Sequence, residues 1–316
     1  MVRILMYIPR RNRIQQHTIH YSIKSTCLQF LRTIDFSHSI QHNNIQYNSS
    51  TPAIIANPNN PEQYIVNVRF VNYIITANGV FVCKTRPMSI HSRFLVDASF
   101  TQITPEVYVD EICEGTGGIE DMRLFYYNNS IYYSACFYQY NAYNLMTCGK
   151  YDTHIEKHTI RSVHTQCHEK NWSYVEYKGE LCMVYIWYPL QIGKIDFTTN
   201  LFHIIEEKQL PEVFKNIRGS TPSYRWKDEI WFIVHTTDMN GSRRNYHHRF
   251  VVFDTNMNLI RYSEPFKFEN YPVEFCLGLI IEQERTIVSY STLDCTTRIG
   301  LLSNEYITHG LMWMQS

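Results

Sequence analysis

One nonapeptide, Gly117-Gly118-Ile119-Glu120-Asp121-Met122-Arg123-Leu124-Phe125, holds the strongest structural signal in this 316-residue chain. Two glycines free the backbone, two carboxylates and an arginine follow, and strand-forming residues carry the chain onward. Successive side chains of a strand point to opposite faces, so Asp121 should share a face with Arg123, and Glu120 should point away from both. The alternative interpretation is an ordinary ion pair at the start of a strand.

The composition favours an all-β protein. Aromatic residues make up 15% of the chain, with 24 tyrosines, and such residues suit strands better than helices. The chain is long enough to bury a substantial core, and its length alone allows one large domain or two small ones.

The charge balance excludes some classes of partner. Lys and Arg total 29, the same as Asp and Glu, so we expect no nucleic-acid partner, which would need a basic surplus. No run approaches the roughly 20 apolar residues of a membrane span, and no signal-peptide core follows the N-terminal arginines. Nine scattered cysteines without a C-x-x-C pair are typical of reduced thiols. Together these features predict a cytoplasmic protein without a membrane span.

Strand-turn-strand patterns recur about every fifty residues. Asn78-Gly79, Asn128-Asn129 and Lys178-Gly179 mark turns between strand-like runs. The first of these turns joins a run over residues 64–75 to a run over residues 80–83. Similar runs follow at 230–235 and 274–291. This period is typical of radial sheet repeats, and the sequence therefore predicts a single five-bladed β-propeller domain over residues 1–316. Residues 1–50 carry little pattern, with a helical turn expected over 27–34, and should close or cap the propeller.

Polar residues at the starts of the repeats should meet. In a propeller the start of each innermost strand faces the central axis, which would gather Arg69, Asp121, Lys170 and Arg218 in one pocket. The alternative is that they cap blade ends and only resemble a ring. The basic loop 242–244 is either a solvated hairpin or a lid over a phosphate group.

The ordered motifs over residues 60–300 resemble those of glycoside hydrolase family 130, the mannoside phosphorylases and their relatives on a five-bladed propeller. The strand Gly118–Arg123 is similar to the family's G-x-E-D-P-R element, with Met122 in place of proline. Arg69 resembles the family's first-blade arginine, and Lys170-Asn171-Trp172 resembles a third-blade lysine element. Trp231–His235 resembles W-L-x-x-Y-H-G with Thr236 in place of glycine, and Tyr246 matches a tyrosine at similar spacing. The closing blade is resembled by Val273–Gly278, Ser289–Ser291 and Asp294. The chain is also similar to β-1,2-mannosyltransferases, which use a nucleotide sugar.

Side-chain chemistry and this resemblance give each residue an expected role. Asp121 is the candidate catalytic acid or base. Arginine and lysine suit phosphate oxygens, and phosphate or donor binding is expected of Arg69, Arg123, Lys170, Arg218, His235 and Tyr246. Sugar contacts are expected of Asn67, Glu120, Asn171, Trp172, Glu274 and Asp294.

The resulting hypothesis is an enzyme of glycosyl transfer with a phosphate-bearing donor or product and a mannose-like sugar. Its partners would be an oligosaccharide or glycan acceptor and a sugar phosphate, nucleotide sugar or inorganic phosphate. A glycoside hydrolase, which needs two carboxylates, and a glycan-binding propeller without catalysis are the alternatives. No cofactor or metal is expected. The one His/Cys-rich group has a spacing that fits no metal motif, and it consists of His154, His158, His164, Cys167 and His168.

Overall fold

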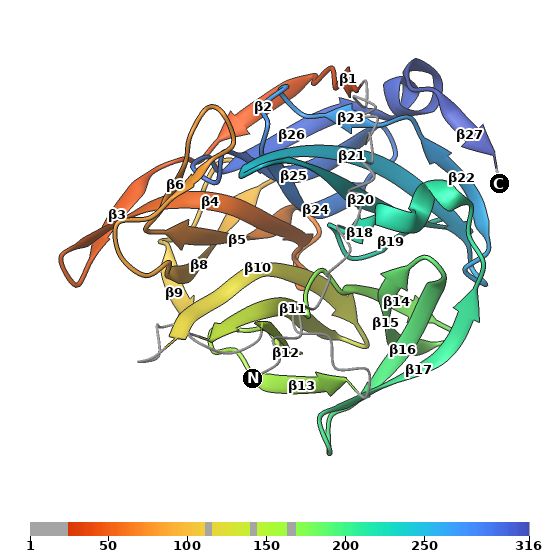
Figure 1. The fold of residues 1–316 in the computed structure, drawn as a ribbon, viewed down its shortest axis with the longest axis horizontal. Coiled ribbons are helices and arrows are strands. Elements are labelled where there is room, and N and C mark those ends of the chain that lie inside the picture. Colours follow the sequence, from red (N-terminus) through yellow and green to blue (C-terminus); the bar gives the residue numbers. More distant parts are fainter. Residues whose placement is uncertain (1–24, 111–115, 140–143, 163–168, 316) are drawn as a thin grey trace, which may run out of the picture.

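The computed structural model describes residues 25–110, 116–139, 144–162 and 169–315. These residues form mostly strands, in sheets arranged around the middle of the molecule (Figure 1). The prediction of an all-β protein is thus confirmed. In the described part of the chain, no helix has the length and apolar character to cross a bilayer, and the cysteines there are free thiols.

The first sheet is antiparallel, in the order β3-β4-β5-β8-β9. Its strands are β3 (Ser39–His42), β4 (Ile45–Ala56), β5 (Gln63–Val71), β8 (Ser89–Asp97) and β9 (Val107–Asp110). A separate hairpin of β6 (Ile74–Ile75) and β7 (Phe81–Val82) turns at the predicted Asn78-Gly79. The predicted continuous strand over 64–75 is interrupted at Asn72, whose side-chain oxygen accepts a hydrogen bond from the backbone of Met88 (2.7 Å).

The next sheet contains two antiparallel groups joined by a parallel pairing of β13 with β17. The first group is β10 (Thr116–Tyr127), β11 (Ser130–Gln139), β12 (Asn144–Lys150) and β13 (His158–Ser162). The second is β14 (Ser173–Tyr177), β15 (Glu180–Trp187), β16 (Leu190–Asp196) and β17 (Leu201–Lys208). The predicted hairpins at Asn128-Asn129 and Lys178-Gly179 are confirmed, and all four turn residues have the positive φ that tight hairpins require.

Two further sheets complete the described chain. After the 3₁₀ turn η1 (Glu212–Asn216), one sheet contains β18 (Arg218–Gly219), β19 (Tyr224–Trp226), β20 (Glu229–Asn240), β21 (Arg243–Asp254), β22 (Leu259–Ser263), β23 (Phe266–Lys267), β1 (Thr26–Cys27) and β27 (Trp313–Gln315). The other contains β24 (Glu274–Ile281), β25 (Arg285–Thr292), β26 (Arg298–Ser303) and β2 (Arg32–Asp35), and the π-helical turn η2 (Tyr306–Gly310) follows β26.

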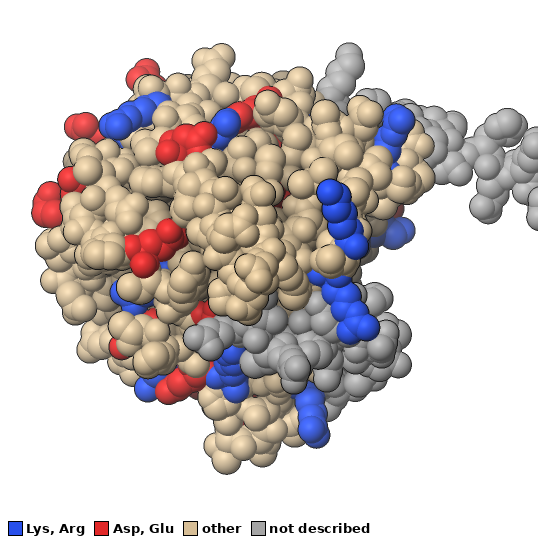
Figure 2. All heavy atoms as spheres, turned by 90° about the vertical axis from the view of Figure 1, so that its left-hand side faces the viewer, with Lys and Arg blue, Asp and Glu red and all other residues tan. Residues whose placement is uncertain are grey.

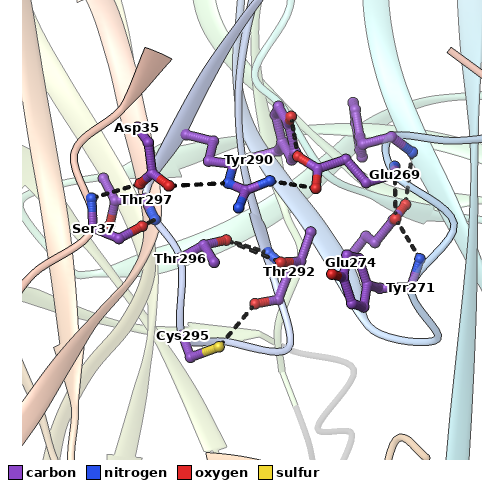
Figure 3. Close-up of polar contacts among 12 residues, drawn as sticks. Asp35, Ser37, Glu269, Tyr271, Glu274, Tyr290, Thr292, Cys295, Thr296 and Thr297 are labelled. Atoms are coloured by element: carbon purple, nitrogen blue, oxygen red, sulfur yellow. Dashed lines mark hydrogen bonds and ion pairs between the residues drawn. The ribbon is translucent and has the colours of Figure 1, made fainter. Parts of the chain in front are cut away.

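Early strands therefore pair with late ones. β2 lies antiparallel beside β26 and β1 lies parallel beside β23 (Figure 1), so the helical turn predicted for residues 27–34 is wrong. The edges of these sheets offer that segment backbone partners that local propensity does not reveal. The guanidinium of Arg298 reinforces the contact, because it lies 3.5 Å from the carboxylate of Asp35 and pairs with Glu269, which also accepts a hydrogen bond from Tyr290 (2.6 Å; Figure 3).

The hydrophobic core lies between neighbouring sheets. In β20, Ile230, Phe232 and Val234 join a cluster with residues of β14–β16, whereas Trp231 and Ile233 join a cluster with residues of β24–β26. Alternation along the strand produces this division. Three more clusters join the first sheet to β10 and β11, the group β10–β13 to the group β14–β17, and the last sheet back to the first.

The outer surface carries charges of both signs. On the face shown in Figure 2, Asp and Glu lie among Lys and Arg, and uncharged residues cover most of the area. Exposed ion pairs such as Lys178 with Glu206 (2.8 Å) contribute little stability each.

Candidate active site

One polar pocket gathers side chains from widely separated parts of the chain. It is lined by Arg69, Tyr73, Glu120, Asp121, Lys170, Asn171, Arg218, His235, Arg244, Tyr246, Val273, Phe275 and Asp294. Nine of these thirteen residues were predicted from the sequence as site residues. Their convergence is what an axial pocket requires, although their individual roles stay predictions.

Both adjacent carboxylates reach the pocket because β10 is bulged. Glu120 lies opposite Cys136 and Arg123 lies opposite Ser134, so three steps on β10 match two on β11, and Asp121 has a φ of 54°. An extra residue of this kind resets the alternation of side chains. The expectation that Glu120 points away from Asp121 is therefore wrong.

Arg69 holds the two carboxylates together. Its Nη1 donates to Oδ1 of Asp121 at 2.8 Å, and its Nη2 lies 3.3 Å from Oε1 of Glu120. The guanidinium is 3% exposed and its Nε donates to the hydroxyl of Ser89 (2.9 Å). Burial raises the pKa of Glu120, and Arg69 opposes this effect.

A third carboxylate, Asp294, completes this acidic half of the pocket. Its Oδ2 accepts a hydrogen bond from the hydroxyl of Tyr73 (2.9 Å), whose ring lies 5.9 Å from the guanidinium carbon of Arg69. Burial also raises the pKa of Asp294. Three carboxylates therefore surround one buried cation.

The other charged residues of the pocket lining are basic and make up its basic half. Lys170, Arg218 and Arg244 line it, and their side chains form no hydrogen bond or ion pair with another described residue. His235 accepts a hydrogen bond from, or donates one to, the hydroxyl of Ser220 (2.8 Å). Burial, with a further contribution from neighbouring His248 and Arg123, lowers the pKa of His235 well below its usual value, so the imidazole is neutral at pH 7.

Tyr246 adds a neutral donor to the basic half. Burial raises the pKa of its hydroxyl, which therefore keeps its proton at neutral pH. Cations and protonated hydroxyls are the groups that bind phosphate oxygens.

Arg123 lies beneath the pocket and does not line it. Its buried guanidinium donates to the backbone oxygens of Ser220 (2.6 Å) and Asp121 (2.8 Å) and to Oδ1 of Asn171 (3.1 Å). The expected phosphate contact is thus replaced by a positioning contact, which ties the bulge of β10 to two other parts of the pocket wall.

Asn67 is buried and also lies outside the pocket. Its side chain accepts a hydrogen bond from the hydroxyl of Tyr151 (3.1 Å) and donates to Nδ1 of His91 (2.9 Å), whose Nε2 donates to the backbone oxygen of Ile119 (3.0 Å). The expected sugar contact is not formed by this arrangement. Asn67 instead holds the residue that precedes the two carboxylates.

Trp172 and Glu274, expected to contact sugar, are interior residues. Trp172 is 1% exposed and packs against Tyr185 and Phe202. The carboxylate of Glu274 accepts three backbone hydrogen bonds from the preceding loop (Figure 3), those of Phe268 (2.7 Å), Glu269 (2.9 Å) and Tyr271 (2.8 Å). Both residues shape the interior rather than the pocket surface.

Glu274→Ala should therefore lower the free energy of unfolding by about 3 kcal/mol, because three buried backbone N–H groups lose a charged acceptor. Urea unfolding measures this change. The exposed Glu284 provides the matched control, and Glu284→Ala should stay within about 0.5 kcal/mol of the parent protein. Equal effects of the two substitutions would contradict the structural role of Glu274.

His91 should make stability depend on pH. Burial lowers its pKa to about 4, below the ordinary value of 6.5, so its contribution is complete above pH 6.5 and is lost as the pH falls towards 4. Removing it by His91→Gln should reduce the slope of unfolding free energy against pH in this window by about 1.4 kcal/mol per pH unit. Urea unfolding at a series of pH values measures the slope, and an unchanged slope would contradict the assignment.

Sequence reasoning missed Tyr73, Val273 and Phe275, and flagged Arg244 only as part of a basic loop. Arg244 is held by the turn of the β6–β7 hairpin, where its backbone N–H donates to the oxygen of Gly79 (3.3 Å). A Cβ at Gly79 would lie 2.6 Å from the Arg244 oxygen, so glycine is required by space as well as by its φ of 77°. The Asn-Gly pair was a visible signal for a turn, but not for what the turn touches.

The His/Cys-rich group is only partly described. His164, Cys167 and His168 lie outside the described residues, and among the described residues no three His, Cys, Asp or Glu side chains are placed to hold a metal ion.

Known proteins resemble this chain in structure but not detectably in sequence. No family model matches the sequence, and no curated protein matches it either. Among solved structures, β-1,2-mannobiose phosphorylase from Listeria innocua has a TM-score of 0.59 at 12% identity and covers 83% of this chain and 92% of its own.

Two proteins from Leishmania mexicana are also similar. A mannose phosphorylase in complex with phosphate ion has a TM-score of 0.53 at 13% identity, covering 83% of this chain and 86% of its own. A GDP-Man-dependent mannosyltransferase has a TM-score of 0.54 at 13% identity, covering 83% and 88%. The fold of this chain is therefore remotely similar to that of the GH130 mannoside phosphorylases and their relatives.

Proposed function

We propose that this protein is a carbohydrate-active enzyme that transfers a mannose-like glycosyl group with a phosphate-bearing donor or product. The observation that carries the proposal is that one pocket combines carboxylates around Asp121 with three basic side chains, Lys170, Arg218 and Arg244, that form no hydrogen bond or ion pair with another described residue. Clustered cations that are not held in ion pairs favour binding of an anion. Phosphorylase and transferase chemistry both need such a site beside one carboxylate.

We further propose that the described residues form one five-bladed β-propeller domain. Support comes from five antiparallel strand groups, from the five core clusters between successive groups, and from the return contact of the last sheet with the first. A separate, mainly apolar pocket is lined by residues that follow the active-site residues in the chain, including Leu124–Tyr126, Pro222–Arg225 and Gly278–Ile280. The active-site pocket and this apolar pocket are lined by successive parts of the same strands, β10 and β24, which is consistent with an axis that runs through the molecule.

In the phosphorylase direction, the basic half binds inorganic phosphate. A phosphate oxygen attacks the anomeric carbon, the glycosidic C–O bond breaks, and Asp121 supplies the proton that the leaving hydroxyl needs, directly or through a sugar hydroxyl. Lys170, Arg218 and Arg244 hold the phosphate in line and stabilise its charge.

In the transferase direction, the same groups act in the opposite sense. The acceptor hydroxyl attacks the anomeric carbon, its proton passes to Asp121, and the C–O bond to the phosphate or diphosphate breaks. The basic half then stabilises the negative charge of the leaving group. Either direction uses one enzymic carboxylate.

A second candidate function, hydrolysis, is favoured by the additional carboxylates. Glu120 and Asp294 line the same pocket as Asp121, and a glycosidase that activates water needs an acid and a base. A hydrolase would release reducing sugar without added phosphate or nucleotide sugar, which separates the two proposals.

A thermal-shift screen with inorganic phosphate, mannose 1-phosphate, GDP-mannose and mannobiose tests the proposal. Stabilisation by phosphate and mannose 1-phosphate supports the phosphorylase, and stabilisation by GDP-mannose alone supports the transferase. Lys170→Met should weaken either response. Stabilisation by mannobiose alone, without any response to the phosphate-bearing ligands, would overturn the proposal in favour of a glycan-binding protein.

A further inference from the structure

A second polar pocket lies on the other side of the strand that forms one wall of the candidate active site. Arg244 and Tyr246 of β21 line the active site, whereas the alternate residues Asn245 and His247 line the second pocket. The next segment divides in the same way, with Val273 in the active site and Pro272 in the second pocket. The two pockets are therefore back to back.

This second pocket has a lining of hydrogen-bonding groups. Its volume of about 430 Å³ lies in the range of ligand sites. The polar side chains that line it are Ser25, Asn78, Asn245, His247, Lys267 and Asn270. Amide groups both donate and accept, so three asparagines can match hydroxyl groups, which have the same dual character.

The polar wall is held in a defined geometry. The ammonium of Lys267, which is 7% exposed, donates to Oδ1 of Asn245 (2.7 Å) and to the backbone oxygen of Tyr271 (2.7 Å). The amide of Asn245 in turn donates to Nε2 of His247 (2.9 Å), and Nδ1 of His247 contacts the hydroxyl of Ser25 (2.5 Å). Burying an ammonium group is unfavourable unless it is hydrogen-bonded, and this chain of contacts satisfies it.

The charge of the second pocket differs from that of the active site. Glu274 and Asp238 oppose the positive charge of Lys267, and a carboxylate oxygen of Asp238 lies 3.3 Å from His247. In the active site, Glu120 acts on Lys170 and Asp294 on Arg244 in the same way, but three cations are grouped there and form no ion pair with a described residue. A nearly neutral pocket rich in amides selects a neutral polyhydroxylated ligand over a phosphate.

We propose that the second pocket is a carbohydrate subsite, which holds a neutral sugar unit of the same glycan whose end reacts in the active site. The inference rests on the proposed function, because the glycan is the acceptor or substrate of that reaction. It predicts that the enzyme recognises chains longer than a disaccharide.

The test measures affinity against chain length by isothermal titration calorimetry, with β-1,2-linked manno-oligosaccharides from the disaccharide to the hexasaccharide. In the parent protein, affinity should rise about tenfold once the chain reaches the second pocket, as one or two added hydrogen bonds would give. The double variant Asn78→Ala/Asn270→Gly should lose most of this rise. Glycine suits position 270 because Asn270 has a φ of 68°, and the exposed Asn216→Ala is the matched control.

Each outcome decides the matter. The same rise with chain length in the parent and the double variant, or no rise in the parent, would overturn the subsite. Protection of the backbone around Lys267 from hydrogen exchange by inorganic phosphate, but not by the hexasaccharide, would overturn it as well. Phosphate-dependent turnover with no effect of chain length contradicts only this inference, whereas failure of the parent to bind any oligosaccharide contradicts the proposed function too.

Discussion

Asp121→Asn is expected to lower the turnover number for glycosyl transfer about a thousandfold, the size of a lost general acid or base. The amide has nearly the shape of the carboxylate and still offers an oxygen to Nη1 of Arg69, so the pocket should keep its form. It cannot supply or accept the proton of the reaction. Steady-state kinetics with mannobiose and phosphate, or with GDP-mannose and an acceptor, measures the loss.

Glu120→Gln is the matched comparison, because Glu120 adjoins Asp121 and contacts the same guanidinium. If the reaction needs one enzymic carboxylate, this variant should retain far more turnover than Asp121→Asn. Near-normal turnover by Asp121→Asn would remove Asp121 from the mechanism. Equal and severe losses in both variants would support hydrolysis by two carboxylates.

Arg123→Met should have the second largest effect, on stability and turnover together. The substitution leaves the backbone oxygens of Asp121 and Ser220 and the side chain of Asn171 without their shared donor. A lowering of the unfolding free energy by about 4 kcal/mol is expected for the loss of several charge-assisted hydrogen bonds in the interior. Urea unfolding measures the loss, and the exposed Arg225→Met is the control.

Kinetics separate a positioning role of Arg123 from direct phosphate binding. Arg123→Lys keeps a charge but not the three-way geometry of the guanidinium, so it should lower kcat with little change in the KM for phosphate. Lys170→Met, at the pocket surface, should mainly raise that KM. A large rise in the KM for phosphate in Arg123→Lys would contradict the positioning role.

Much of the local architecture followed from the sequence. Short continuous apolar runs such as Ile230 to Val234, and turn pairs such as Asn128-Asn129, indicate strands and hairpins by short-range chemistry alone. The gathering of Arg69, Asp121, Lys170 and Arg218 followed from their similar places in successive repeats. The first signal depends only on residues close together in the chain, and the second on a pattern that recurs about every fifty residues.

Other features depend on contacts between distant residues. The bulge at Asp121 is stabilised by Arg123, whose guanidinium also donates hydrogen bonds to the backbone oxygens of Gly219 and Ser220. The strand pattern around Arg123 does not reveal which polar groups its guanidinium will contact. The same applies to Trp172 and Glu274, whose residue types suit a sugar site but whose environments are interior. Strand β2 was missed because its partner β26 lies more than 250 residues later in the chain.

The pairing of β2 with β26 also constrains how the protein is made. A nascent chain leaves the ribosome with β2 among the first described strands, and it must remain without its partner until β26, which ends at Ser303, has been synthesised. Pairings of such long sequence separation are slow to form. The final sheet is thus completed only after Ser303 has emerged, and until then an unpaired strand edge is exposed to other chains.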